Sequence, residues 1–377
     1  MSIYPWQAHR KPAEPGSTNT LTQPIGASEY EDRVIGTLLG CVCGDVLGAN
    51  LEKVPMADIK ERYGRVSDFI GSAGRPLGQY TDDSEMTLAL ASSLVHRNGI
   101  DPAYCATAYA YFYQLPATRG YGGTTKKILK ALSQGVDYRT TGTLFLPGGS
   151  FANGGVMRIA PIGVAFRNAP DVILQQAVTL ALQPTHTHPE GIDGAWMQAK
   201  LIGWLIKLKP DFLNPNTCIT WLQAMAKTEI MHAKLVSVER GLREEWDNET
   251  LLNRICTKNE RGHIFQIHAA EAFACALWIL LRHYQNPEEA IIHAVGMGGD
   301  SDTIGAIVGA QVGALHGTAW IPHRWFDNIE NEPKTGRDVF IEVGKDLAKL
   351  DLATLQLAPW PKKRSIFTQF RRPTHSP

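Results

Sequence analysis

Two short segments, far apart along the chain, each place a pair of aspartates beside a threonine. The first is TDD at residues 81–83, and the second is DSDT at residues 300–303. The two carboxylates of a pair lie within one turn, where only one can cap a helix and where like charges repel unless a cation intervenes. Carboxylate and hydroxyl oxygens, with no histidine or thiolate nearby, form a ligand set that suits Mg²⁺, Ca²⁺ or Mn²⁺ rather than Zn²⁺. Both segments are therefore candidate ligands of a hard divalent cation.

A third acidic segment, GDVLGANLE at residues 44–52, contains Asp45 and Glu52. If the three segments meet in space, at least four carboxylates share one site. One divalent ion would leave excess negative charge there and two would neutralise it, so we expect a dinuclear centre. Helix capping is the alternative for each segment on its own, because an aspartate in the first turn satisfies free amides and contributes about 0.5–2 kcal/mol.

Glycines recur at every fourth position in two helical segments. They are Gly36, Gly40, Gly44 and Gly48 in the first segment and Gly305, Gly309, Gly313 and Gly317 in the second. A glycine inside a helix costs roughly 1 kcal/mol relative to alanine, so the repetition indicates that another backbone approaches closely. We expect these two helices to pack against each other, which would bring Asp302 and Thr303 near the end of the first helix.

Helical periodicity dominates from Asp32 onward. Apolar residues recur at spacings of three and four in residues 86–95, 125–135, 171–183, 194–208 and 269–284, whereas strand signals are sparse. We predict an all-α fold with one helical domain over residues 32–350. Residues 1–31 are rich in Pro, Ser, Thr and Gly, which predicts an extended N-terminal arm. Residues 351–377 are expected to be a solvated tail, and a nucleic-acid tether is the weaker alternative for its basic end.

The composition is that of a soluble globular protein, with 44% hydrophobic and 20% charged residues. Because 37 basic residues balance 37 acidic ones, no net field attracts nucleic acid or an anionic membrane.

Six cysteines without a CxxC pair indicate reduced thiols rather than a disulfide scaffold or structural zinc. The N-terminus lacks the apolar core of a signal peptide, and the longest apolar run, 305–321, is short of the ~20 residues that a membrane span needs. We therefore expect a cytoplasmic protein.

Five blocks, taken in order, resemble the ADP-ribosylglycohydrolase family. They are GDVLGANLE (44–52), TDDSEMTLALA (81–91), SFANGGVMRIAPIG (150–163), THTHPEGIDGA (185–195) and GGDSDTIGAIVGAQVGALHG (298–317). The family includes dinitrogenase reductase-activating glycohydrolases and ADP-ribosyl-acceptor hydrolases. The resemblance, over roughly residues 33–325, implies an orthogonal multi-helix fold, two Mg²⁺ or Mn²⁺ ions, and hydrolysis of the glycosidic bond between ADP-ribose and an acceptor side chain.

The resemblance also implies the metal ligands. They are Thr81, Asp82, Asp83, Asp300, Asp302 and Thr303. Glu52 matches a mobile acidic residue near the metals, and either Glu52 or Asp302 would transfer the catalytic proton. The departures from the family pattern are Ser84 and Ser301, which stand where threonine is common and retain a short hydroxyl.

A further set of residues matches the family's ADP-ribose-binding positions. They are Gly120, Gly122, Gly123, Ser150, Phe151, Asn153 and His186. The glycine loop would lie along the diphosphate, because glycines let the backbone come close and leave N–H groups pointing outward; an ordinary interhelical turn is the alternative. Phe151 would stack on adenine, with core packing as the alternative. His188 is expected to have a capping or structural role, since nothing beside it completes a zinc site.

Three functional hypotheses follow. The first is a metal-dependent hydrolase that removes ADP-ribose from a modified protein, with arginine as the expected acceptor. The second is an immunity or binding protein whose cleft and N-terminal arm block an ADP-ribosyltransferase toxin, with or without hydrolysis. The third, a family fold that has lost catalysis, is disfavoured because every acidic position of the motifs is occupied.

Overall fold

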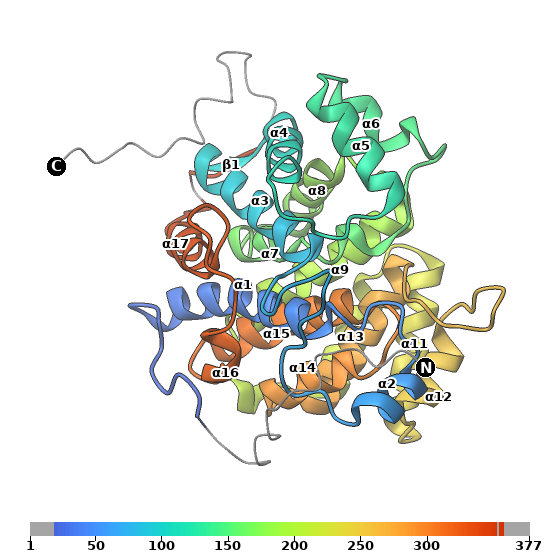
Figure 1. Cartoon of the computed structure of the whole chain (residues 1–377). Helices are drawn as coiled ribbons and strands as arrows, with labels where there is room; N and C mark the ends of the chain where they lie inside the picture. Colours follow the sequence, from blue (N-terminus) through green and yellow to red (C-terminus); the bar gives the residue numbers. More distant parts are fainter. Residues whose placement is uncertain (1–18, 353, 358–377) are drawn as a thin grey trace.

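The computed structural model describes residues 19–352 and 354–357, and this part of the chain is almost entirely helical (Figure 1). The helices are α1 (Glu29–Gly48), α2 (Met56–Tyr63), α3 (Asp82–Arg97), α4 (Pro102–Tyr113), α5 (Gly123–Ser133), α6 (Tyr138–Leu144), α7 (Ala160–Ala165), α8 (Asp171–Leu182), α9 (Pro189–Leu205), α10 (Pro215–Met225), α11 (Glu229–Arg243), α12 (Asn248–Ile255), α13 (Ala269–His283), α14 (Pro287–Val295), α15 (Ser301–His316), α16 (His323–Phe326) and α17 (Arg337–Ala348). Two 3₁₀ turns, η1 (Asn153–Gly155) and η2 (Pro210–Phe212), and one parallel pair of two-residue strands, β1 (Gly99–Ile100) and β2 (Gln356–Leu357), complete the described elements. The all-α prediction is confirmed.

Helices α1 and α15 lie side by side at the centre of the molecule (Figure 1). Their glycine faces meet: a Cβ added to Gly44 would lie 1.9 Å from the carbonyl oxygen of Gly305, and one added to Gly36 would lie 2.4 Å from that of Gly317. No side chain fits between the two backbones, which confirms the predicted packing. The helices are antiparallel, so the end of α1 lies beside the start of α15.

The remaining helices surround this pair. Helices α3 and α17 contact α1, whereas α13 and α14 contact α15. Helix α13 is buried along nearly its whole length, from Ala269 to Leu281, and helix α15 from Ser301 to Leu315. Helices that are apolar on all sides belong in the interior of a large domain, where every face finds an apolar neighbour. Polar side chains that could act in a reaction are therefore expected at the ends of these buried helices rather than along their apolar lengths.

The segment before α1 lies against a distant part of the chain. The amide of Leu21 donates to the carbonyl of Ile321 (3.0 Å), and the amide of His323 donates to the carbonyl of Asn19 (2.9 Å). Helix α1 begins at Glu29 with the Ser28 side chain as its N-cap, so the predicted boundary at residues 31 and 32 falls inside this helix. Residues 1–18 and 358–377 lie outside the described residues, and the hypothesis that the arm binds a partner stays a prediction.

All six cysteines are free thiols, in line with the sequence. Cys256 and Cys275 come closest to each other, with their sulfur atoms 3.6 Å apart. Across the described residues, we find no helix that combines the length and the apolar character needed to cross a bilayer.

Candidate functional site

One cavity of about 630 Å³ opens where α1 ends and where α3, α5 and α15 begin. Its lining contains Glu52, Asp82, Asp83, Gly120, Gly122, Gly123, Ser150, Phe151, Asn153, His186, Asp300, Asp302 and Thr303. The structure thus brings together every site residue proposed from the sequence except Thr81. That threonine is fully buried, and its hydroxyl donates to the Asp83 carboxylate (2.9 Å).

The start of α3 is held by a carboxylate from another helix. Asp45, on α1, accepts hydrogen bonds from the amide of Thr81 (2.9 Å) and from both the amide (3.0 Å) and the hydroxyl (2.6 Å) of Ser84. Thr81 is the N-cap of α3 and accepts from the amide of Asp83 (3.4 Å), and Asp45 satisfies the amide of Ser84, so neither aspartate of the TDD segment serves as the cap. The side chains of Asp82 and Asp83 are left to face the cavity.

A second scaffold holds the start of α15. Gly298 and Gly299 adopt left-handed backbone conformations (φ 67° and 72°), which turn the chain into the helix. The Asp300 carboxylate accepts a hydrogen bond from the Asn153 side chain (2.5 Å), and its amide donates to the side-chain oxygen of Gln266 (2.9 Å). Asn153 and Gln266 thus orient Asp300 between them. The sequence offered no local signal for Gln266.

The acids of the three segments influence one another's ionisation. Burial is the main cause that raises the pKa of Asp82 to about 8 and of Asp300 to about 6. Burial also raises the pKa of Asp83 and Asp302, and the negative charge of Asp300 adds to both shifts. The charge of Glu52 contributes to the raised pKa of Asp82, Asp300 and Asp302. Carboxylates from residues 52, 82–83 and 300–302 therefore lie within electrostatic reach of each other.

This oxygen-rich set fits a hard divalent cation in its chemistry. One oxygen of Asp83, Oδ1, is buried without a hydrogen-bond partner in the described structure. A buried carboxylate oxygen without a donor is costly, and a cation would satisfy it. Within the described ranges, however, no three His, Cys, Asp or Glu side chains already stand in the arrangement that would hold an ion. The two-metal centre stays a prediction.

The glycine loop and the start of α5 also line the cavity, and a Cβ added to Gly120 would lie 3.9 Å from the Asp82 carboxylate. Gly120 has a left-handed backbone (φ +91°), and Gly122 is the N-cap of α5. A Cβ added to Gly123 would meet nothing within 4 Å, so space is open beside this turn. The loop is an interhelical turn and also presents a helix N-terminus to the cavity, a favourable place for a phosphate group.

His186 and Phe151 lie further along the same cavity. Burial and the nearby Arg158 guanidinium hold the pKa of His186 well below its usual range, so this imidazole is neutral. Phe151 is 37% exposed and stacks on His268 with ring centroids 4.6 Å apart, so it is not a core residue. His188 accepts a hydrogen bond from the amide of Glu190 (3.3 Å) at the start of α9, which is the capping role expected for it.

A buried ionic cluster that the sequence analysis missed supports the cavity wall. Tyr121 lines the cavity, and its hydroxyl donates to Glu85 (2.7 Å). Arg119 donates to the same carboxylate through Nε (3.0 Å) and also pairs with Glu330. Both Arg119 and Tyr121 belong to the RGYGG segment, so that segment was the available signal.

Comparison with known proteins decides the family. The model of the ADP-ribosylglycohydrolase family matches residues 27–356. The chain belongs to the ADP-ribosylglycohydrolase family. The resemblance seen in the five motif blocks is thereby confirmed over nearly the whole described chain.

Individual relatives agree with this assignment to the ADP-ribosylglycohydrolases. ADP-ribosylhydrolase ARH3 of Bos taurus is 26% identical over 339 residues, which cover 82% of this chain and 92% of the relative. The ADP-ribosyl-[dinitrogen reductase] glycohydrolase of Rhodospirillum rubrum is 27% identical over 309 residues, which cover 79% of this chain and 90% of the relative. A solved structure, described as an ADP-ribosylglycohydrolase-related protein complex, matches with a TM-score of 0.64 and 26% identity, covering 85% of this chain and 99% of its own. This ADP-ribosylglycohydrolase is an enzyme that hydrolyses ADP-ribosyl linkages.

Proposed function

We propose that this ADP-ribosylglycohydrolase uses two Mg²⁺ or Mn²⁺ ions to remove ADP-ribose from modified proteins, and that arginine is the acceptor. The observation that carries the proposal is one cavity that is lined both by acids from three distant segments and by a glycine-bordered helix N-terminus. The acids suit a metal-assisted reaction at the ribose, and the helix N-terminus suits the diphosphate of the same ligand.

Two kinds of residue would take part in the reaction: the ligands of the metal ions and one acid that transfers a proton. The residues that would hold the ions are Thr81, Asp82, Asp83, Asp300, Asp302 and Thr303. When bound, the ions orient the ribose hydroxyls and activate a water molecule for attack. Glycosidic cleavage also needs a group that moves a proton as positive charge develops on the sugar. We assign this role to Glu52, whose side chain is 23% exposed, rather than to Asp302, which is buried among the ligands.

The charge of the cavity supports arginine as the acceptor. Glu52, Asp82 and Asp300 line the same cavity wall. The two ions would neutralise Asp82 and Asp300, but Glu52 lies outside the ligand set, so its carboxylate can pair with a guanidinium leaving group, whereas a serine hydroxyl gains no comparable attraction. The name of the Rhodospirillum rubrum relative refers to a modified protein as its target, which supports a protein substrate here.

A panel of two peptides tests the proposal. One peptide carries ADP-ribose on arginine and the other on serine, and the release of ADP-ribose is measured with Mg²⁺, with Mn²⁺ and with EDTA. We expect release from the arginine peptide that EDTA abolishes and that Asp302→Asn lowers at least about 100-fold. Asp211→Asn, an exposed position on η2, is the matched control and retains full activity. Undiminished release in EDTA would refute the metal requirement, and faster release from the serine peptide would refute the acceptor.

A further inference from the structure

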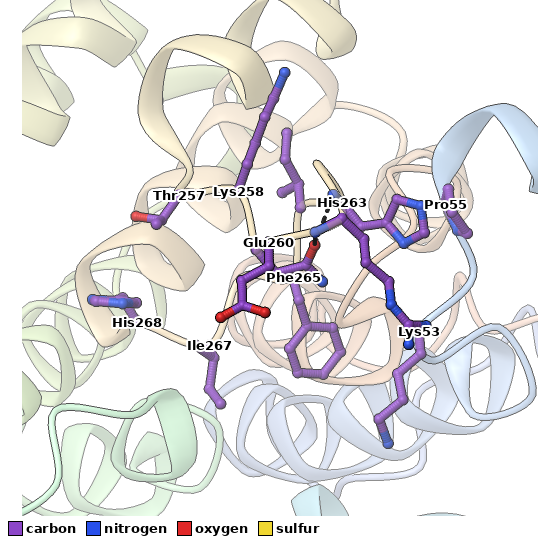
Figure 2. A pocket seen from close by; sticks show the side chains of 12 residues that line it. Lys53, Pro55, Thr257, Lys258, Glu260, His263, Phe265, Ile267 and His268 are labelled. Carbon is purple, nitrogen blue, oxygen red and sulfur yellow. Dashed lines mark hydrogen bonds between the residues drawn. The ribbon is translucent and has the colours of Figure 1, made fainter.

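Figure 2 shows a second hollow of about 630 Å³, which we call the groove. One side of the groove contains Lys53 and Pro55, and the other is the loop over residues 257–268. This loop folds back on itself, because Lys258 pairs with Ile264 in a bridge. The groove and the cavity share three lining residues, Lys53, Phe265 and Ile267, and are therefore neighbours on either side of these residues.

The groove is positively charged in a protein that has no net charge. Three of its lining residues are Lys53, Lys258 and Arg261, and Glu260 is its one acid. Lys258 and Arg261 are exposed, and neither forms an ion pair within the described part of the chain. Two cationic side chains that remain without counter-charges are available to a negatively charged ligand.

Lys53 connects the groove to the reactive end of the cavity. Its side chain pairs with Glu52 at 2.7 Å, and its amide donates to the carbonyl of Gly299 (2.7 Å), next to Asp300. The backbone of Lys53 is left-handed (φ 68°), a conformation that costs a lysine energy and that surrounding contacts must maintain. A ligand in the groove would thus lie next to the proposed catalytic acid.

We propose that the groove binds an acidic segment of the modified protein, adjacent to the ADP-ribosylated residue. This inference rests on the proposed function, since it assigns the polypeptide of that substrate to a subsite. Apolar side chains of Pro55, Ile264 and Phe265 lie among the cationic ones, and an extended peptide can match such a mixed surface with alternating side chains. The zero net charge of the chain favours a short acidic peptide over a nucleic acid, whose binding depends on many phosphate contacts.

The test uses two peptides with one ADP-ribosylated arginine each, flanked by four glutamates in one and by four glutamines in the other. For the wild-type protein in low salt, we expect kcat/KM to be about fivefold higher for the glutamate peptide, as two partly exposed ion pairs would give. The ratio of kcat/KM for the glutamate peptide to kcat/KM for the glutamine peptide should fall to about one in the Lys258→Gln/Arg261→Gln double variant. The Lys345→Gln/Lys349→Gln variant, on α17 and at its C-cap away from the groove, should keep the wild-type ratio of the two kcat/KM values.

Fluorescence anisotropy with the same peptides, labelled and without ADP-ribose, measures the groove independently of hydrolysis. Tighter binding of the glutamate peptide, lost in the Lys258→Gln/Arg261→Gln variant, supports the inference even where no ADP-ribose is released, in which case the proposed function alone fails. Equal affinity for both peptides overturns the inference. Tighter binding of a labelled oligothymidylate than of the glutamate peptide, lost in the same double variant, also overturns it and identifies the groove as a nucleic-acid site.

Discussion

The imidazole rings of His283 and His293 stack with their centroids 4.1 Å apart and their planes 13° from parallel. The stack joins the end of α13 to α14. Burial is the main cause that lowers the pKa of His283 to about 4, and the positive charges of His293 and Arg282 lower it further. Protonation of His283 is therefore opposed in the folded protein.

This histidine pair predicts how stability depends on pH. The folded-state pKa of His283 lies below the usual value of about 6.5, so the unfolded chain binds more protons between pH 6.5 and 4. The free energy of unfolding should fall as the pH decreases through this interval. His283→Phe retains an aromatic stack without a titrating group and should make the decline shallower. Urea unfolding at pH 7, 6, 5 and 4.5 measures the slope, with His232→Phe, exposed on α11, as the control. Equal slopes in wild type and His283→Phe would exclude this role.

Gly44→Ala tests the backbone contact between the two central helices. The new Cβ would meet the carbonyl oxygen of Gly305 at 1.9 Å, and neither backbone can move without disturbing a fully buried helix. We expect a loss of at least about 3 kcal/mol in the free energy of unfolding. Gly74→Ala, where the Cβ would meet nothing within 4 Å, should change it by less than about 0.5 kcal/mol. Both values come from urea unfolding, and similar losses in the two variants would contradict the packing argument.

Asp45→Ala tests the additional cap that Asp45, on α1, provides for the first turn of α3 beside the Thr81 N-cap. Removal of the carboxylate leaves the amides of Thr81 and Ser84 without their acceptor, and each unsatisfied buried donor costs about 1–3 kcal/mol. A loss of about 3 kcal/mol in unfolding free energy is expected. Asp211→Ala, an exposed aspartate, is the matched control and should be close to neutral. If Asp45→Ala unfolds at the wild-type urea concentration, the cap contributes nothing.

Asp302→Asn should change stability in opposite directions with and without metal. Burial and the charges of Asp83 and Asp300 raise the pKa of Asp302 and oppose its ionisation, so the neutral amide should stabilise the metal-free protein. Mg²⁺ at 100 times its Kd should stabilise the wild type by about 2.7 kcal/mol, and the variant should gain much less. Thermal unfolding with Mg²⁺ and with EDTA measures both effects. An equal Mg²⁺-dependent rise in Tm for the two proteins would place the ions elsewhere.

Phe151→Ala should weaken the binding of ADP-ribose. The ring is exposed at the cavity wall, and its stacking on adenine would contribute about 1 kcal/mol, roughly a fivefold change in Kd. Phe151→Tyr retains an aromatic face and should bind as the wild type does. Calorimetric titration with ADP-ribose gives the three Kd values, and Phe212→Ala, on a side chain 72% exposed at η2, is the control. An unchanged Kd in Phe151→Ala would assign the ring a packing role with His268.

The sequence by itself determined the two features on which the site depends. Glycine at every fourth position leaves one helix face without side chains, so the contact of α1 with α15 followed from local spacing. The expectation of a hard cation also came from local spacing, because paired aspartates beside threonine offer hard oxygen atoms at any place in a fold, and it stays a prediction. These inferences required no knowledge of which other segments lie nearby.

Only the tertiary structure decided which groups complete and orient the site. The first turn of α3 is held by Asp45 on another helix, and Asp300 is oriented by Gln266 from a loop. The groove arises because Lys53 lies across from residues 257–268. These partners are separated by 34 or more residues from the groups that they contact. Such contacts depend on how helices pack rather than on local spacing, so no periodicity or motif in the sequence indicates them.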